Sequence, residues 1–143
     1  MPEINVRQRF NQSPEQVFAA LSTHASLNKL FWPVQVVRTK DATDPQNPDG
    51  VGSIRQMGFG PIKPLAEKVT AFEPNQMIEY ILLGKSPVRD HLGRLTFTAD
   101  GQGTLVDYHI ELDSSIPLLA PAVLTGLQVV IRTGLSRMAR TLA

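Results

Sequence analysis

The feature that most constrains the fold of this chain is its uncharged C-terminal quarter. From Ser114 to Ile131 there are 18 residues without a formal charge, and three arginines follow, Arg132, Arg137 and Arg140. Such a stretch can cross a bilayer, cover the core of a globular domain, or form the wall of an apolar cavity. The choice among these three decides what the rest of the chain is for.

The apolar residues of this stretch recur at spacings of three and four, which predicts a helix with one apolar side. A length of 18 residues is near the lower limit for crossing about 30 Å of hydrocarbon, and Pro117, Pro121 and Gln128 weaken that case further. We therefore expect no membrane span, but a core helix that begins near residues 118–120. Its apolar side comprises Leu119, Val123, Leu124, Leu127, Val130, Ile131, Leu135, Met138 and Leu142.

The composition of the chain is that of one ordinary globular domain over residues 1–143. A net charge of +1 argues against nucleic acid as a partner, because such proteins carry a basic surplus on one face. Without cysteine there are no disulfides and no zinc sites built on thiolates. The N-terminus lacks a basic start followed by an apolar run, so we expect no signal peptide and a cytoplasmic protein.

The remaining pattern predicts a strand, two short helices, six further strands and the long helix. Alternation of Ile4, Val6 and Phe10 predicts a strand over residues 3–11. Ser13 begins a capping box that predicts a first helix, and Thr23 begins a second one. The later strands are expected at residues 34–40, 51–57, 65–72, 77–83, 89–98 and 104–113.

Six segments, in this order, carry a resemblance to a known fold. They are residues 4–10, Ser13-Pro14-Glu15-Gln16-Val17-Phe18, residues 30–33 with Trp32, Gly50-Val51-Gly52-Ser53-Ile54-Arg55, Glu67-Lys68-Val69-Thr70-Ala71-Phe72-Glu73-Pro74, and residues 101–108. Over essentially the whole length the chain resembles the START/Bet v1-like (SRPBCC) superfamily, and within it the bacterial polyketide cyclase/dehydrase and lipid-transport group. The resemblance implies an α+β helix-grip fold, in which a curved antiparallel sheet of about seven strands wraps around the C-terminal helix.

The expected cavity lies between this sheet and the helix, and strand parity sorts side chains into its wall. The polar candidates are Arg55, Glu67, Tyr80, His91 and Tyr108. Each has a simpler interpretation, since the tyrosines can be core rings, His91 can be bonded locally, and Arg55 can pair with Glu67. The expected apolar wall comprises Trp32, Leu95, Phe97, Leu124, Leu127, Ile131 and Leu135.

Conventional catalytic signals are missing from the sequence. The three histidines, His24, His91 and His109, lack metal-binding spacing, so we expect no metal, and nothing predicts a cofactor. The glycines and prolines of residues 58–64 form either a loop that gates the cavity mouth or a tight connection.

Three functions are compatible with the predicted fold and cavity. The first is a protein that holds a hydrophobic ligand, a lipid or polyketide-like molecule, as the resemblance implies. The second is an enzyme of the cyclase/dehydratase kind, in which His91 or Tyr80 moves a proton while Glu67 or Arg55 steers the polarity. The third is a protein-partner module of the chaperone-activator type that uses the outer sheet face. A monomer or a weak dimer fits all three.

Overall fold

The computed structural model describes residues 2–84 and 87–142 of the chain. The order of elements is the predicted one, with two short helices after the first strand and one long helix at the end. The elements are β1 (Glu3–Phe10), α1 (Pro14–Leu21), α2 (His24–Leu30), β2 (Gln35–Lys40), β3 (Ile54–Phe59), β4 (Ile62–Glu73), β5 (Met77–Leu83), β6 (Val88–Asp100), β7 (Gly103–Ser114) and α3 (Leu119–Thr141).

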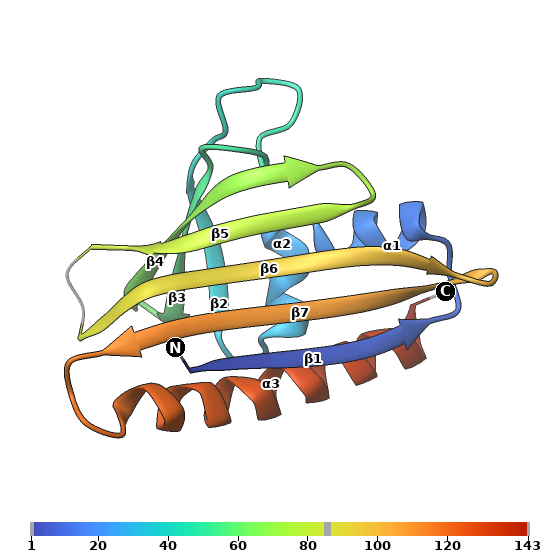
Figure 1. The fold of residues 1–143 in the computed structure, drawn as a ribbon. Coiled ribbons are helices and arrows are strands. Elements are labelled where there is room, and N and C mark those ends of the chain that lie inside the picture. The colour runs from blue at the N-terminus through green and yellow to red at the C-terminus, as the bar shows by residue number, and fades with distance from the viewer. Residues whose placement is uncertain (1, 85–86, 143) are drawn as a thin grey trace.

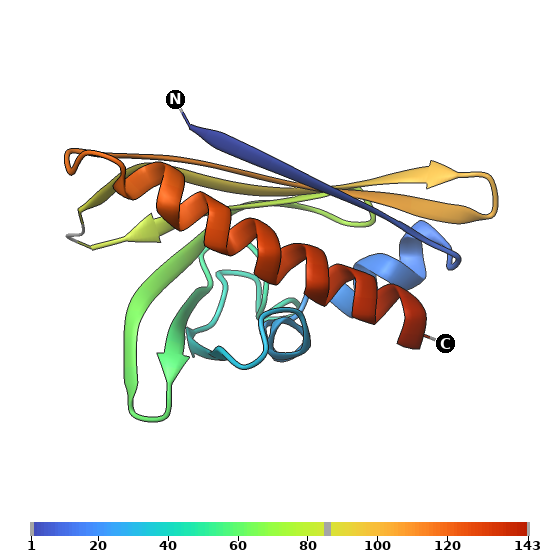
Figure 2. The ribbon, with the colours of Figure 1, turned by 90° about the horizontal axis from the view of Figure 1, so that it is seen from below.

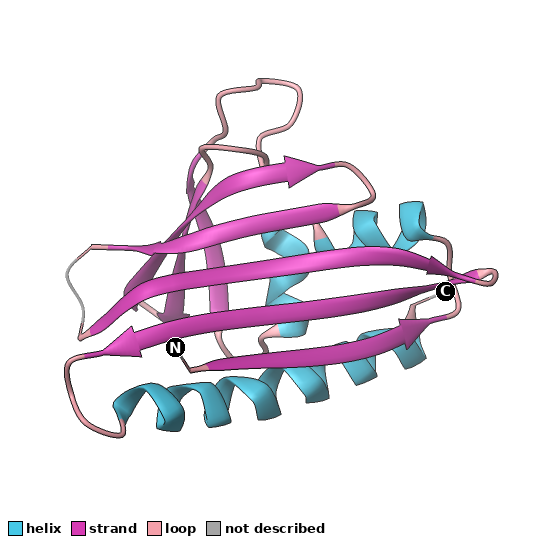
Figure 3. Cartoon of the chain, viewed as in Figure 1, coloured by secondary structure: helices cyan, strands magenta, loops and turns pink. Residues whose placement is uncertain are grey.

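The strands form one antiparallel sheet in the order β1-β7-β6-β5-β4-β3-β2. The sheet is strongly bent, because β1, β7, β6 and β5 run side by side along the molecule while β2 and β3 run across it (Figure 1). Helix α3 runs beneath β1 in that view and in the cartoon coloured by secondary structure (Figure 3). The view turned by 90° shows the three helices on one side of the long strands (Figure 2). The α+β helix-grip architecture is therefore confirmed.

Local sequence signals set the starts of the two short helices. Ser13 accepts a hydrogen bond from the Gln16 N–H, and the Gln16 side chain accepts one from the Ser13 N–H, so the predicted capping box is present. The Thr23 hydroxyl caps α2 in the same way by accepting from the Ser26 N–H. The two caps thereby fix the residues at which α1 and α2 begin.

Helix α3 begins at Leu119, within the predicted range. Its length and composition would also allow it to cross a membrane, and among the described residues it is the one helix that meets this test. The core helix of a globular domain meets the same test. Leu124, Ile131 and Leu135 of α3 are buried in the core formed with the sheet, so α3 has the character of a core helix.

Strict alternation along β4 predicts that residues 65, 67, 69 and 71 share the inner face, and this prediction is wrong at the end of the strand. The pairing with β5 shifts by one residue between Val69 and Ala71. Such an irregularity turns the following side chains to the opposite faces. Phe72 therefore packs in the core, with its ring 5.2 Å from that of Phe18.

Helix α3 approaches α2 closely at Gly134, and this contact gives a stability prediction. A Cβ at Gly134 would overlap the carbonyl oxygen of Leu30, whereas a Cβ at Gly126 of the same helix meets open space. We expect Gly134→Ala to lower the free energy of unfolding by about 3 kcal/mol through overpacking. Gly126→Ala should raise it by up to about 1 kcal/mol, because alanine favours the helix. Urea unfolding measures both, and equal effects of the two alanines would contradict the close approach.

Candidate functional site

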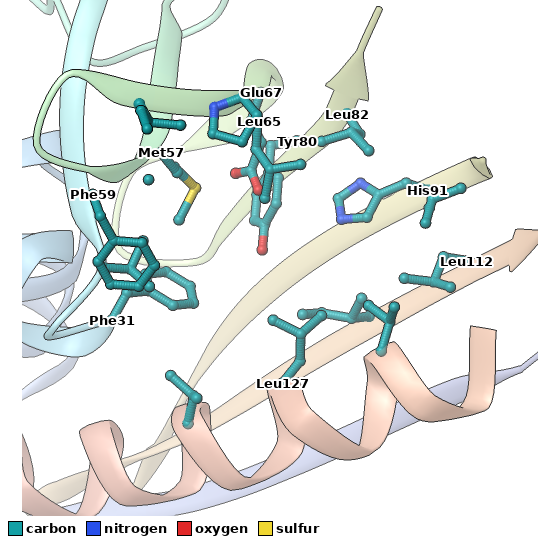
Figure 4. Close-up of a pocket in the computed structure, with 18 residues that line it drawn as sticks. Phe31, Met57, Phe59, Leu65, Glu67, Tyr80, Leu82, His91, Leu112 and Leu127 are labelled. Carbon is teal, nitrogen blue, oxygen red and sulfur yellow. The ribbon is translucent and has the colours of Figure 1, made fainter. Parts of the chain in front are cut away.

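A pocket of about 360 Å³ lies between the inner face of the sheet and α3. Its walls come from four parts of the fold: the end of α2, the β3–β4 hairpin, the middle of the sheet and the first half of α3 (Figure 4). Leu82 and Leu112 contribute the sheet wall and Phe31 the wall beside α2. Except for a few polar side chains, the lining is aliphatic and aromatic, which suits an apolar ligand.

The apolar residues of α3 fall into two groups, one packed in the core and one lining the pocket. Leu124, Ile131 and Leu135 close the core. Val123, Leu127 and Val130 are half-buried and line the pocket. The predicted stripe is thus wide enough to serve both as core and as cavity wall.

The β3–β4 hairpin forms the wall opposite α3 and contains the segment rich in glycine and proline. β3 continues to Phe59 and β4 starts at Ile62, so the segment is a tight connection and not a separate loop. The Gly60 N–H donates to Oε1 of Gln35 at 3.0 Å, which ties the hairpin tip to the start of β2. Phe59 and Ile62 both line the pocket.

Glu67 contributes a carboxylate to the pocket wall, and this carboxylate forms an ion pair with Arg55, which lies behind the wall. Nε of Arg55 donates to Oε2 of Glu67 at 3.0 Å, and Nη2 lies 2.9 Å from the same oxygen. The Arg55 guanidinium is buried 4.4 Å from the centre of the Tyr80 ring. Burial alone would lower the pKa of Arg55, but the Glu67 carboxylate and the two phenols nearby raise it, so this residue stays cationic.

Two buried tyrosines complete the polar base of the pocket. The hydroxyls of Tyr80 and Tyr108 are hydrogen-bonded to each other. Burial raises the pKa of both phenols, so both are neutral at ordinary pH. The Tyr80 ring lies over Gly93 of the neighbouring strand, where any Cβ would overlap it. Gly93 therefore positions Tyr80 at the pocket.

His91 presents the third polar group of the pocket, and its ring points into it (Figure 4). Burial lowers the pKa of His91; Glu67 opposes this effect, while Arg55 adds to it. The imidazole is thus neutral near pH 7. Its Nδ1 is buried and has no hydrogen-bond partner among residues 2–84 and 87–142. A neutral ring with a free nitrogen can bond to a ligand or accept its proton.

The structure places four of the predicted cavity residues on the pocket wall: Glu67, Tyr80, His91 and Leu127. Arg55 and Tyr108 lie behind this wall and contact it through Glu67 and Tyr80. The other buried candidates belong to the closed core and do not line the pocket. They are Leu95, Phe97, Leu124, Ile131 and Leu135.

Trp32 also lies outside the pocket. It follows α2 and is 70% exposed, beside a separate shallow hollow that includes Lys29 and Arg137. Sequence reasoning instead missed the hairpin residues Phe59 and Ile62 as parts of the wall. The signal that could have found them is the pair of apolar residues flanking Gly60-Pro61, since apolar residues at an exposed turn need a reason.

A second cluster of polar groups lies around His24, away from the pocket. Nε2 of His24 is 3.4 Å from the Ser53 hydroxyl, and its backbone N–H donates to Asp49 at 3.2 Å. Arg38 donates to the same carboxylate at 2.9 Å. The residue types match a nucleophilic triad, but Ser53 is fully buried and donates to the Gly50 carbonyl. The cluster therefore anchors the connection between β2 and β3.

His24 makes stability depend on pH. Burial lowers its pKa from 6.5 to about 4, with Arg55 and Arg38 acting in the same direction and Asp49 opposing them. The unfolded chain therefore binds a proton below pH 6.5 that the folded chain refuses until about pH 4, which removes about 2–3 kcal/mol of stability across that range. We expect the free energy of unfolding of His24→Gln to fall less between pH 7 and pH 4.5 than that of the wild type. Parallel pH profiles in urea unfolding would contradict this role.

Strand parity predicts that His109 is a solvated residue on the outer face of the sheet. It lies on that face but is half-buried. Its Nδ1 is 2.9 Å from Oδ1 of Asn5, and its Nε2 is 3.0 Å from Oε2 of Glu111. The pairing of β1 with β7 also brings Glu3 close enough for the three groups to hold a metal ion in principle. The hydrogen bonds of both ring nitrogens already account for this arrangement.

The comparisons with known proteins agree with this geometry. A family described as polyketide cyclase / dehydrase and lipid transport matches residues 1–143. No curated protein matches the sequence. The Aha1 dimer from Colwellia psychrerythraea is 23% identical, with a TM-score of 0.69 over 99% of this chain and 96% of that one. XoxI from Bacillus cereus is 15% identical, with a TM-score of 0.73 over the same shares.

Ara h 8.0201, a Bet v1-like protein, is 10% identical, with a TM-score of 0.69 over 98% of both chains. At these identities the solved structures show the fold alone, whereas the family match covers the whole sequence. The chain thus belongs to the polyketide cyclase / dehydrase and lipid transport family and has a Bet v1-like, helix-grip fold.

Proposed function

We propose that this protein is a cytoplasmic binding protein that holds a small, mostly apolar molecule between its sheet and α3. The observation that carries the proposal is the pocket of about 360 Å³ with an almost wholly apolar wall. Pockets of this size and character are typical of small-molecule sites. Membership of a family named for polyketide and lipid chemistry supports a ligand-binding role.

The polar groups define what kind of molecule fits. Glu67, Tyr80 and His91 lie together on the sheet side of the pocket, whereas the wall formed by α3 offers only Val123, Leu127 and Val130. A ligand with an apolar body and one hydroxyl or carbonyl group satisfies both sides. Its polar end supplies the partner that Nδ1 of His91 lacks among the described residues.

A displacement titration tests this proposal. A fluorescent fatty acid should bind with a rise in emission, and a lipid or polyketide extract should displace it. A fluorescence titration that shows no saturable binding of the probe, and no protection of the protein against heat by any extract, would contradict the proposal.

A second candidate is an enzyme that closes a ring or removes water, and His91 is the observation that favours it. Its lowered pKa leaves a neutral base in an apolar pocket, beside the paired carboxylate of Glu67. If His91 removes water from the ligand, the compound recovered from His91→Ala should be heavier than the wild-type compound by the mass of one water. If His91 closes a ring by aldol addition, the two compounds should have equal mass but differ in chromatographic retention and fragmentation. Recovery of the same compound from both proteins favours binding alone.

A further inference from the structure

We propose that the mouth of the pocket docks on an anionic lipid membrane. The surface in question joins the hairpin residues Phe59, Ile62, Lys63 and Leu65 to the neighbouring hollow that contains Lys29, Trp32 and Arg137, and is called the mouth face below. Exposed apolar side chains, continuity with the cavity and a one-sided charge distribution each support the proposal.

The apolar part of the mouth face is exposed and continuous with the cavity wall. Phe59 is 60% exposed and Ile62 is 72% exposed, although both also line the pocket. The β2–β3 pairing sets Gln35 opposite Gly58, which brings Trp32, three residues earlier, to the same end of the hairpin. The hairpin and α2 extend from the same side of α3 (Figure 2). Apolar surface of this kind marks a contact with another apolar phase.

The charge distribution selects an anionic partner. The segments that contain the residues of the mouth face, 22–40, 56–66 and 115–142, hold seven of the fourteen lysines and arginines and none of the thirteen aspartates and glutamates. Glu67 follows the second segment and lines the pocket, where it is paired with Arg55. Arg38, within the first segment, is neutralised by Asp41 and Asp49. In the part of the chain that the structure describes, Lys29, Lys63 and Arg137 form no ion pair. Their charge is available to an external anion.

A lipid surface fits this combination better than other partners do. A tryptophan and protruding aliphatic side chains next to lysine and arginine are typical of surfaces that lie in the headgroup region. Nucleic acid offers no phase in which Phe59 and Ile62 can be buried. A second copy of the chain would bring the cations of two mouth faces together, which opposes association.

Docking at this face would let a ligand of low water solubility pass between the bilayer and the cavity. That purpose rests on the proposed function, but the docking itself does not require an occupied cavity. Sedimentation with vesicles therefore tests docking independently of the ligand. Failure to bind vesicles would leave ligand binding intact, and failure to bind a fatty-acid probe would leave docking intact.

The test compares sedimentation with phosphatidylglycerol vesicles and with phosphatidylcholine vesicles. We expect binding to the anionic vesicles that weakens as salt is added. Ile62→Ser should weaken it about tenfold, because an exposed aliphatic side chain no longer enters the bilayer. Val51→Ser is the matched control, since Val51 is 44% exposed but precedes the opposite end of β3. Equal losses in the two variants would overturn the proposal.

The contribution of positive charge to vesicle binding is tested with two lysines of the same strand. Lys63 and Lys68 both belong to β4, but Lys68 lies outside the mouth face. We expect Lys63→Gln to weaken binding about fivefold and Lys68→Gln to leave it unchanged. Absence of the wild-type protein from the vesicle pellet would overturn the proposal. So would sedimentation velocity showing a dimer that Ile62→Ser dissociates, because the mouth face would then be an interface between two copies.

Discussion

Replacing Glu67 by leucine should lower the free energy of unfolding by about 3–5 kcal/mol. The reason is the charge that remains: Arg55 is buried, and Glu67 is its ion-pair partner in the structure, at 2.9 Å. Without the carboxylate, the guanidinium loses its ion pair but keeps its contact with the Tyr80 ring, and such a contact is worth about 2 kcal/mol when desolvated. Urea unfolding at pH 7 measures the loss.

The double variant Arg55→Met/Glu67→Leu is the control. Removing both charges leaves no unpaired buried ion, and apolar side chains of similar size often replace such a pair at little cost. We therefore expect the double variant to be more stable than Glu67→Leu by at least about 2 kcal/mol. If the double variant is less stable than either single variant, the pair is not coupled as the geometry indicates.

Filling the pocket from α3 should abolish ligand binding. Leu127 lines the pocket from the helix side, opposite the hairpin (Figure 4), and a tryptophan there adds a large ring to a cavity of about 360 Å³. We expect Leu127→Trp to weaken the binding of a fluorescent fatty acid by at least about a hundredfold, because the indole ring of the new tryptophan occupies the space that the fatty acid needs. A probe titration at constant temperature measures this.

Val129→Trp provides the matched variant on the same helix. Val129 is 63% exposed and does not line the pocket, so the same ring is added outside the cavity. Probe binding should stay at the wild-type level, and both variants should retain a cooperative thermal transition. Weakening of similar size in both variants would mean that the effect reaches the probe through the helix and not through the cavity.

The fold was predictable because its signals are local. The capping box at Ser13, the alternation in β1 and the stripe of α3 each report the structure of their own segment. Their order then leaves few ways to cover one apolar sheet face with one long helix. The register shift after Val69 could not be predicted from the sequence of β4 alone, because it depends on how β4 pairs with β5.

The site was only partly predictable, because parity gives the face of a side chain but not its depth. Tyr108 and Ile110 share the inner face of β7, yet Ile110 lines the pocket while Tyr108 lies behind Tyr80. The pairing of Arg55 with Glu67 was one of two alternatives, and the β3–β4 register decides it by placing them opposite each other. Trp32 was misplaced because its position depends on where α2 ends against the rest of the fold.

Native mass spectrometry of the purified protein tests the central claim, that the pocket holds a small apolar molecule. We predict a second species in the wild-type spectrum, heavier than the chain by one bound molecule and released by mild collisional activation. The same preparation of Leu127→Trp should lack this species, while Val129→Trp should retain it. A wild-type spectrum without the species, even after incubation with a lipid extract, or an adduct that persists in Leu127→Trp, would contradict the account.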